Sequence, residues 1–311
     1  MTQFLQTSLN GFVVGSLYAL IALGYTMVYG ILKFINFAHG DIFALGVHLT
    51  ILIAALFGIQ GLAGDVPPPW YVGIAVLITT MLACGVVGFI IERAAYRPLR
   101  HAPRLNVLIT AIGISLLLQN AGQLPIFFGP YPRATPNLLT DTTLATVAGV
   151  QIKLVDVAVV GLAFAIMAGL QYLIFSTRFG LAMRAVSFHP RHAGLMGINV
   201  DRVISFTFVV GSMLAAAAGV LYTLKYPGQA KQTADVMWVM LGLKAFVAAV
   251  VGGIGNIRGA LLGGLLIGLS EFYGVNYLGS NYRDAYVFAI LIIVLLVRPQ
   301  GILGSDTIEK V

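Results

Sequence analysis

The stretch TRFGLAMRAVSFHPRHAGLMGINVDR (Thr177–Arg202) separates two long apolar segments and is the longest part of the chain without a continuous apolar stripe. Pro190 can begin a short helix, because its missing N–H is one that the first helical turn leaves unpaired anyway. Gly197 can end that helix in the left-handed conformation. Ala193 and Met196 are three residues apart and would share one face. The stretch therefore predicts a short helix with a small apolar face, which is either a docking surface or an ordinary basic loop between membrane spans.

The composition around this stretch indicates a membrane protein. Of the 311 residues, 59% are hydrophobic and 9% are charged, whereas soluble domains carry about 25% charged residues. The 36 glycines fit this class, since small residues let membrane helices approach closely. Cys84 is the single cysteine, which excludes a disulfide framework and a cysteine zinc site. We expect an all-α, polytopic helical membrane protein with a single domain over residues 1–311.

The distribution of charge predicts how the chain is oriented. A net charge of +7 could indicate nucleic-acid binding, but the basic residues lie in short loops between apolar spans, where the positive-inside bias explains them. No basic residue precedes Lys33, so we predict that the N-terminus is not a signal peptide and lies outside. The opening stretch is then cytoplasmic, with one acid, Asp201, against four arginines: Arg178, Arg184, Arg191 and Arg202.

Apolar segments of about 20 residues, long enough to cross the hydrocarbon core, alternate with these loops. We predict about nine crossings (about 8–10 transmembrane helices), with the N-terminus outside and the C-terminus cytoplasmic. Segments 35–57 and 241–264 are interrupted by glycine and could hold one or two discontinuous or re-entrant helices. The predicted outer loops are Gly61–Pro69, Gly129–Gln151 and Pro227–Asp235. The predicted spans are Ser8–Ile31, Ile35–Phe57, Trp70–Glu92, Leu105–Phe128, Ile152–Phe175, Val203–Tyr226, Trp238–Ile254, Gly259–Asn276 and Ala285–Val297.

The polar segment NFAHGD opens the second predicted span. A broken helix there would expose backbone groups that bind a solute, provided that they line a cavity. The candidate residues of such a solute path are Asn36, His39, Gly40 and Asp41. The alternative is that His39 and Asp41 lie at the membrane interface, where the Asp41 carboxylate caps the helix.

Lys244 lies within an apolar segment, and a charge in such a place usually faces a cavity or a partner. Its alternative is an extended side chain that reaches the outer interface. The three glycines that follow either pack closely against a neighbouring helix or mark a re-entrant part of the path. They are Gly252, Gly253 and Gly255.

Other polar residues in the spans are assigned structural roles. Glu271 lies late in its span, so we expect it near the outer surface and not as a proton carrier. Interhelical hydrogen bonds are the expected role of three amides, Gln119, Asn120 and Gln123.

Motifs for catalysis are missing from the sequence. It lacks the G-x-x-x-x-G-K-[ST] nucleotide loop, the H-E-x-x-H metal motif and the G-x-S-x-G nucleophile signature. We therefore predict no catalytic residue, no metal ligand and no cofactor in this chain.

Three stretches together resemble a known family. They are GSLYALIALGYTMVYGILKFINFAHGDIFALG (residues 15–46), RAVSFHPRHAGLMGINVDRVISFTFVVGSMLAAAAGVL (184–221) and GLKAFVAAVVGGIGNIRGALLGGLLIGLSE (242–271). These stretches are similar to the integral-membrane permease family of branched-chain amino acid ABC importers. The similarity runs from about Leu9 to Leu303 without large insertions. Within the family, the chain resembles the LivH-type subunit more than the LivM-type subunit.

The resemblance implies partners for the opening stretch. A family member pairs with a homologous second permease (LivM-type), two cytoplasmic ABC ATPase subunits that bind ATP and Mg, and an extracytoplasmic substrate-binding protein. It resides in the bacterial inner membrane as a multi-pass protein. Thr177–Arg202 would be the cytoplasmic coupling loop. The residues implied to contact the ATPase are Arg184, Ala185, Ala193, Met196, Gly197 and Ile198.

The resemblance leaves the solute open. Related permeases serve leucine, isoleucine and valine, or urea and short amides, and a branched-chain amino acid is our first expectation. An alternative from another class is a secondary transporter driven by an ion gradient, which would use Asp41 as its titratable group. A passive channel or a scaffold for other membrane proteins is a third interpretation.

Overall fold

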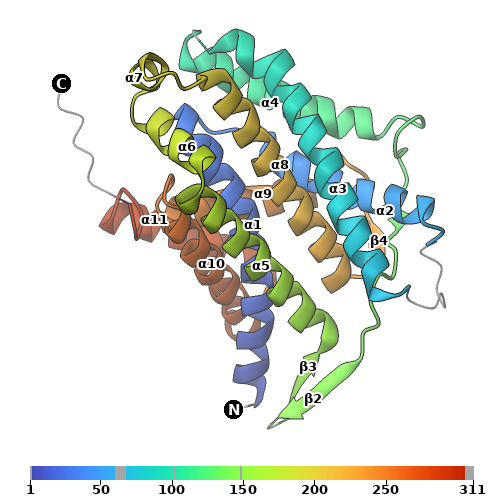
Figure 1. Cartoon of the computed structure of the whole chain (residues 1–311). Helices are drawn as coiled ribbons and strands as arrows, with labels where there is room; N and C mark the ends of the chain where they lie inside the picture. Colours follow the sequence, from blue (N-terminus) through green and yellow to red (C-terminus); the bar gives the residue numbers. More distant parts are fainter. Residues whose placement is uncertain (1, 60–67, 101, 148, 305–311) are drawn as a thin grey trace.

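In the computed structural model, residues 2–59, 68–100, 102–147 and 149–304 are described, which leaves most of the predicted loop Gly61–Pro69 outside. This part of the chain is a helical bundle (Figure 1). Eight helices are long and apolar enough to cross a membrane, and a shorter apolar helix, α9, lies among them. The polytopic helical fold is thereby confirmed. The α-helices are α1 (Thr2–Leu32), α2 (His39–Leu56), α3 (Trp70–Ile91), α4 (Arg104–Gly122), α5 (Leu154–Ser176), α6 (Arg178–Phe188), α7 (Pro190–Leu195), α8 (Val200–Lys225), α9 (Val236–Gly252), α10 (Ile257–Leu278) and α11 (Arg283–Val297).

Helix α1 lies in the interior of the bundle and is 31 residues long. It packs antiparallel against α10, since Gly11 lies against Leu269 and Gly15 against Leu265. A Cβ added at Gly15 would be 2.9 Å from the Cα of Leu265. Backbones this close need glycine at the contact, which is how small residues hold membrane helices together.

Helix α8 is the second inner helix and packs against α1, α2, α3 and α5. The alanine run Ala215–Ala218 is fully buried. Gly46 of α2 approaches Ala216, and Gly219 approaches the backbone of α2 in turn. The small side chains of α8 thus allow close packing in the same way as the glycines of α1.

Two predicted outer loops contain strands that the sequence analysis did not predict. Within Gly129–Gln151 and the residues that follow it, β2 (Thr143–Val147) and β3 (Val150–Lys153) form an antiparallel hairpin. In addition, β1 (Arg133–Ala134) pairs with β4 (Gln229–Ala230), which joins this segment to Pro227–Asp235. The β-branched residues of TLATV favour strands, and Gly149 takes φ +81° at the turn.

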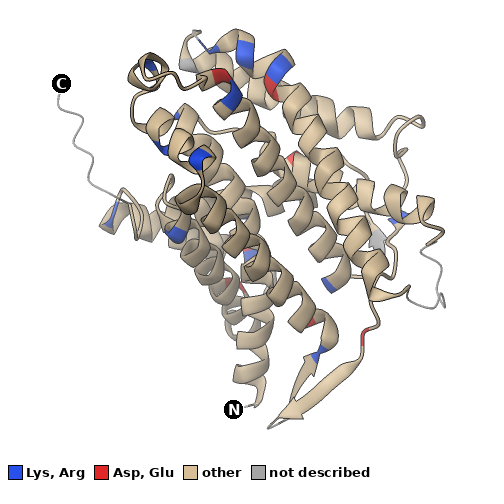
Figure 2. Cartoon of the chain, viewed as in Figure 1, with Lys and Arg blue, Asp and Glu red and all other residues tan. Residues whose placement is uncertain are grey.

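The bundle has two distinct ends. We call residues 92–100 and 177–202 the basic end, and residues 129–156 and 225–235 the hairpin end. Figure 2 shows Lys and Arg gathered around α6, α7 and the nearby end of α3. Lys225, an apparent exception to the charge bias, pairs at 2.5 Å with Asp156, whose side chain is 3% exposed. Its positive charge is therefore neutralised inside the bundle.

Two short helices continue α3 at the basic end. A π-helix, η1 (Glu92–Tyr96), follows directly, and a 3-10 helix, η2 (Arg97–Leu99), ends the segment. A third short helix, η3 (Ser280–Tyr282), precedes α11. Single π-turns in α-helices frequently lie at functional sites, and η1 contacts both α4 and α8.

Candidate functional site

The opening stretch folds into two helices at the basic end. Thr177 caps α6, because its hydroxyl oxygen accepts a hydrogen bond from the Gly180 N–H at 3.0 Å. Pro190 occupies the first turn of α7, and Gly197 beyond its end has φ +83°. The predicted short helix from Pro190 to the turn at Gly197 is confirmed, whereas α6 was not predicted.

The exposed face of this stretch differs from the prediction. Ala193 is buried, whereas Met196 is 84% exposed. The predicted shared face is wrong, because α7 ends at Leu195 and Met196 lies in the turn that follows. Leu195 and Phe188 are exposed to a similar extent, at 84% and 82%. These three side chains, Phe188, Leu195 and Met196, form what we call the apolar tip.

The remaining residues of the predicted coupling set surround the apolar tip. Gly197 is exposed, and Ala185 and Ile198 are half-buried. The Arg184 guanidinium lies over the Phe175 ring, 5.4 Å from its centre. The set is therefore divided between an exposed tip and a layer that attaches it to the bundle.

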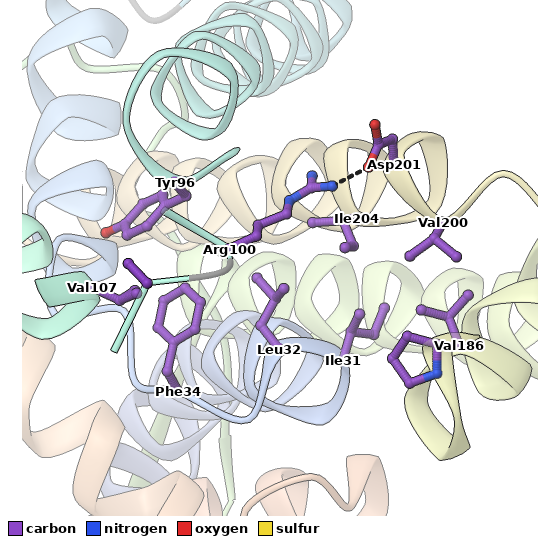
Figure 3. A pocket seen from close by; sticks show the side chains of 12 residues that line it. Ile31, Leu32, Phe34, Tyr96, Arg100, Val107, Val186, Val200, Asp201 and Ile204 are labelled. Atoms are coloured by element: carbon purple, nitrogen blue, oxygen red, sulfur yellow. Dashed lines mark hydrogen bonds and ion pairs between the residues drawn. The ribbon is translucent and has the colours of Figure 1, made fainter. Parts of the chain in front are cut away.

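A cavity of about 480 Å³ lies beneath α7. Its walls are mainly aliphatic, and Pro190 and Val186 line the side nearest α7. Arg100 extends along another wall toward Asp201 (Figure 3). Because the cavity lies between α7 and the rest of the bundle, α7 has space in which to shift.

An ion cluster joins the start of α8 to the π-helix η1. Asp201, in the first turn of α8, pairs with Arg97 at 2.5 Å and also with Arg100. Arg100 pairs in turn with Glu92, whose side chain is fully buried. The Ser205 hydroxyl donates a hydrogen bond to the same Glu92 carboxylate at 2.6 Å. The first turns of α8 are thus bonded to η1 through Ser205 and Glu92, and to the segment at η2 through Asp201, Arg97 and Arg100.

From η1 the contact continues to the start of α2. The Tyr96 hydroxyl donates a hydrogen bond to the Asn36 side-chain oxygen at 2.6 Å, and both residues are buried. Asn36 lies in the non-helical segment that precedes His39, the first residue of α2. One path of polar contacts therefore links Asp201 to the start of α2.

Helix α2 begins within the bundle. His39 lies against Gly24, where an added Cβ would collide with the imidazole ring. Gly24 precedes the end of α1 by eight residues, which correspond to about 12 Å of helix. Residues 33–38 therefore fold back along α1, as a discontinuous entry to α2 requires. The alternative in which Asp41 caps α2 is wrong, because Ala38 is the N-cap and has no side-chain cap hydrogen bond.

A second cavity, of about 350 Å³, lies between α1, α2, α4 and α9. Gly40 and Asp41 line it, and the Gln119 amide donates a hydrogen bond to the Asp41 carboxylate at 2.7 Å. Gly40 packs directly on Gly242 of α9. We call this cavity the Asp41 pocket. Its other lining residues are Tyr25, Phe37, Ile112, Ser115, Leu116, Val239 and Leu243.

Lys244 does not line the Asp41 pocket. Its ammonium pairs with Glu271 at 2.7 Å and with Asp284 at 2.6 Å. Arg283 also pairs with Glu271, which accepts a hydrogen bond from the Tyr18 hydroxyl at 2.7 Å. Glu271 is fully buried among these counterions, seven residues before the end of α10. This charged cluster joins α1, α9, α10 and α11.

The glycines that follow Lys244 form the turn between α9 and α10. An added Cβ on Gly252 would collide with the Gly259 carbonyl, and Gly253 and Gly255 have φ +106° and +95°. This geometry corresponds to the close-packing alternative, at a distance from Gly40 and Asp41 along α9.

Two of the three amides, Gln119 and Asn120, make bonds of different kinds. Gln119 makes the predicted interhelical bond, to Asp41. Asn120 instead donates to the Leu116 carbonyl of its own helix, so for Asn120 the prediction is wrong.

Sequence reasoning missed Tyr96, Ser115 and Ser205. Each becomes important only through contacts with residues far away in the sequence, such as the bond from Tyr96 to Asn36. The signal that could have indicated η1 is ERAAYRPLR, in which Pro98 must disturb the regular helix.

Comparisons with known proteins agree with this arrangement. A family model described as branched-chain amino acid transport system / permease component matches residues 7–296. The chain is 42% identical over 315 residues to the high-affinity branched-chain amino acid transport system permease protein BraD of Pseudomonas aeruginosa, covering 99% of this chain and 98% of BraD. It is 41% identical over 311 residues to the permease protein LivH of the corresponding Escherichia coli system, with 99% and 98% covered. The probable branched-chain amino acid transport permease protein LivM of Methanocaldococcus jannaschii is 26% identical, with 94% and 92% covered.

Proposed function

This chain belongs to the family of branched-chain amino acid transport system permease components, and we propose that it forms the translocation path of an ATP-driven importer for leucine, isoleucine and valine. It is a multi-pass permease subunit of the bacterial inner membrane. The observation that carries the proposal is the path of contacts from the apolar tip to the Asp41 pocket. A permease needs such a connection between the surface that its motor moves and the route of its solute.

In this proposal, ATP and Mg bind to two separate ABC ATPase subunits, which dock at the basic end. The basic end faces the cytoplasm according to the positive-inside bias. Phe188, Leu195 and Met196 support the docking role, since each is more than 80% exposed and exposed apolar patches mark protein interfaces. The hairpin end then faces outward and receives the extracytoplasmic substrate-binding protein.

The Asp41 pocket supports an aliphatic α-amino acid as the solute. The carboxylate of Asp41 can attract the α-ammonium group, while the hydroxyl of Ser115, which accepts a hydrogen bond from the Gln119 amide at 3.1 Å, can donate to the α-carboxylate. The surrounding walls are mainly apolar, with aliphatic side chains such as Leu116 and Val239 and the aromatic rings of Tyr25 and Phe37. An apolar cavity with a few convergent polar groups is the usual form of a small-molecule site.

A second, homologous permease would complete this pocket. Ile112, Leu116 and Val239 line the pocket and are 47%, 54% and 41% exposed. A homologous subunit that covers them would enclose the path between two related chains. The similarity of this chain to a LivM protein as well as to LivH proteins supports such a pair.

The mechanism that we propose is alternating access. ATP binding and hydrolysis in the partners move the apolar tip and α7, and the cavity beneath α7 accommodates the shift. Asp201 and Arg100 carry the movement to η1, and the bond from Tyr96 to Asn36 carries it to the start of α2. Asp41 then faces the two sides of the membrane in turn. The ATPase can bias the permease only through contacts that differ between these states.

Reconstitution tests this function directly. Proteoliposomes that contain this chain, the second permease, the ATPases and the binding protein should accumulate leucine only with ATP. The chain alone should not take up leucine under a proton or sodium gradient, and gradient-driven uptake by it would contradict the proposal. Uptake of urea without uptake of leucine would show that the solute is urea and not a branched-chain amino acid.

The solute site has its own test. Asp41→Asn should lower leucine uptake at least about 10-fold, because it removes the charge that attracts the ammonium group. Asn120→Ala is the matched control, since the Asn120 amide bonds only within α4 and its loss should leave uptake within about twofold of normal. Equal uptake by both variants would exclude Asp41 from the path.

A further inference from the structure

A third cavity lies at the basic end between α3 and α8, beside the ion cluster around Asp201. Its volume is about 470 Å³. Arg93, Arg97 and Arg202 line it together with a single carboxylate, Asp201. Figure 2 shows the basic segments where α3 ends and α8 begins. The cavity therefore carries a positive charge that its own acid only partly neutralises.

Two of these guanidiniums have no acidic partner. Asp201 already pairs with Arg97 and Arg100. Among the residues that the structure describes, no carboxylate lies within ion-pair distance of Arg93 or Arg202, and both are exposed. They are available to an anion from outside the chain.

Each free arginine stands at the end of an apolar stripe. On α3, Leu82, Val86 and Phe89 are 56%, 59% and 43% exposed, and their spacing continues to Arg93 at intervals of three and four residues. Residues at such intervals lie on one helix face. On α8, Phe206 and Val209 follow Arg202 at the same intervals and line the same cavity. Farther along the two helices from the arginines, the cavity is lined by the apolar side chains Phe89, Phe206 and Val209.

We propose that an anionic phospholipid binds between α3 and α8, with its phosphate on Arg93 and Arg202 and an acyl chain along Phe89, Val86 and Phe206. A basic pocket between membrane helices that continues into an apolar groove has the chemistry of a lipid site. A free anion would contact only the arginines and would leave the apolar side chains of the cavity uncovered. An acidic protein surface would bind the arginines but would leave the exposed apolar stripe on α3 without an apolar partner.

The test counts bound lipid on the full chain. Purified chain is exchanged into nanodiscs of phosphatidylglycerol mixed with phosphatidylcholine, and the retained lipid is measured by native mass spectrometry. Wild type should retain phosphatidylglycerol in preference to phosphatidylcholine. Arg93→Gln/Arg202→Gln should weaken its retention about 30-fold, which follows from about fivefold for each basic residue near the surface.

Two further variants separate this site from general charge effects. Arg178→Gln/Arg191→Gln removes the same charge from the basic end, away from the stripes, and should retain the lipid within about threefold of wild type. Arg93→Lys/Arg202→Lys keeps both charges and should restore retention. The lysine variant is also a control for folding, because it changes the same two positions without removing their charge. The elution profile of each protein shows directly whether the glutamine variant is folded.

Several results would overturn the proposal. One is equal retention of the two lipids by wild type. Another is wild-type retention of phosphatidylglycerol by the folded glutamine variant. Displacement of the lipid by millimolar inorganic phosphate would indicate a free-anion site instead. Loss of ATPase binding by the glutamine variant, with its lipid still bound, would assign the cavity to a protein partner.

Discussion

The two ends of the bundle differ in how many of their basic residues pair with a carboxylate. At the hairpin end, Lys153, Lys225 and Lys231 pair with aspartates at 2.6, 2.5 and 3.6 Å. At the basic end, the carboxylates of the described residues pair only with Arg97 and Arg100. Among the described residues, the basic-end residues without such a pair are Arg93, Arg178, Arg184, Arg191 and Arg202, whereas at the hairpin end Arg133 alone lacks one.

This difference separates a self-contained region from one that needs partners. Charges that are neutralised within the chain fix the loops of the hairpin end to the helices. Unpaired charges beside the apolar tip are open to proteins and lipids. The one ion cluster at the basic end, around Asp201, is then the element that carries movement into the bundle.

The largest expected effect is on stability and comes from the hairpin end. Asp156→Asn leaves Lys225 as a nearly buried charge without a counterion, its remaining acceptor being the Asn10 side chain at 3.5 Å, which should destabilise the protein by about 3–5 kcal/mol. Thermal unfolding in detergent measures this change. The uptake of leucine by each remaining folded molecule should not change. A loss of stability below about 1 kcal/mol would show that Lys225 finds water or another acceptor.

The second effect is on coupling and comes from the basic end. Asp201→Asn should weaken the attachment of α8 to Arg97 and Arg100, since a hydrogen bond to a charged group contributes about 1.5–3 kcal/mol. Leucine uptake should fall about 10-fold, the ratio that corresponds to about 1.4 kcal/mol. ATP hydrolysis should continue but lose its stimulation by the loaded binding protein. Normal stimulation would exclude the Asp201 cluster from the relay.

A smaller effect should follow from the removal of one hydroxyl. Tyr96→Phe deletes the bond to Asn36, which contributes about 1 kcal/mol, and uptake should fall about fivefold. Tyr172→Phe is the matched control, because Tyr172 is 67% exposed on α5. If both variants transport at the normal rate, the path from η1 to α2 does not carry the movement.

The smallest effect should come from the exposed ion pair of the hairpin end. Lys153 and Asp141 are 42% and 45% exposed, and such pairs contribute about 0–1 kcal/mol. Lys153→Gln should lower the free energy of unfolding, measured by thermal unfolding, by at most about 1 kcal/mol. Leucine uptake should stay within about twofold of normal. A large loss of uptake would show that the hairpin end depends on this charge for binding its partner.

The sequence predicted the features that depend on local patterns. Apolar length indicated the spans, Pro190 and Gly197 indicated α7, and the polar run before Asp41 gave the broken entry to α2 as one of two alternatives. Each of these signals lies within a few residues of the structure that it causes.

Features that depend on distant contacts were not predictable in this way. The apolar tip differed because the end of α7 turns Met196 away from Ala193. Glu271 is buried because Lys244, Arg283 and Tyr18 come from three other helices. A single sequence holds no information on which of these residues meet. The strand pairing of Arg133 with Ala230 was missed for the same reason.

The central claim is that the apolar tip couples an ATPase to the solute path, and Met196→Asp tests it most directly. The variant places a charge on a side chain that is 84% exposed, so insertion and folding should be normal, and Met196→Leu serves as the control. In proteoliposomes with all partner subunits, ATP-driven leucine uptake and substrate-stimulated hydrolysis are measured together. We predict that Met196→Asp loses both while Met196→Leu keeps both. Normal uptake and normal stimulation in the aspartate variant would contradict the account.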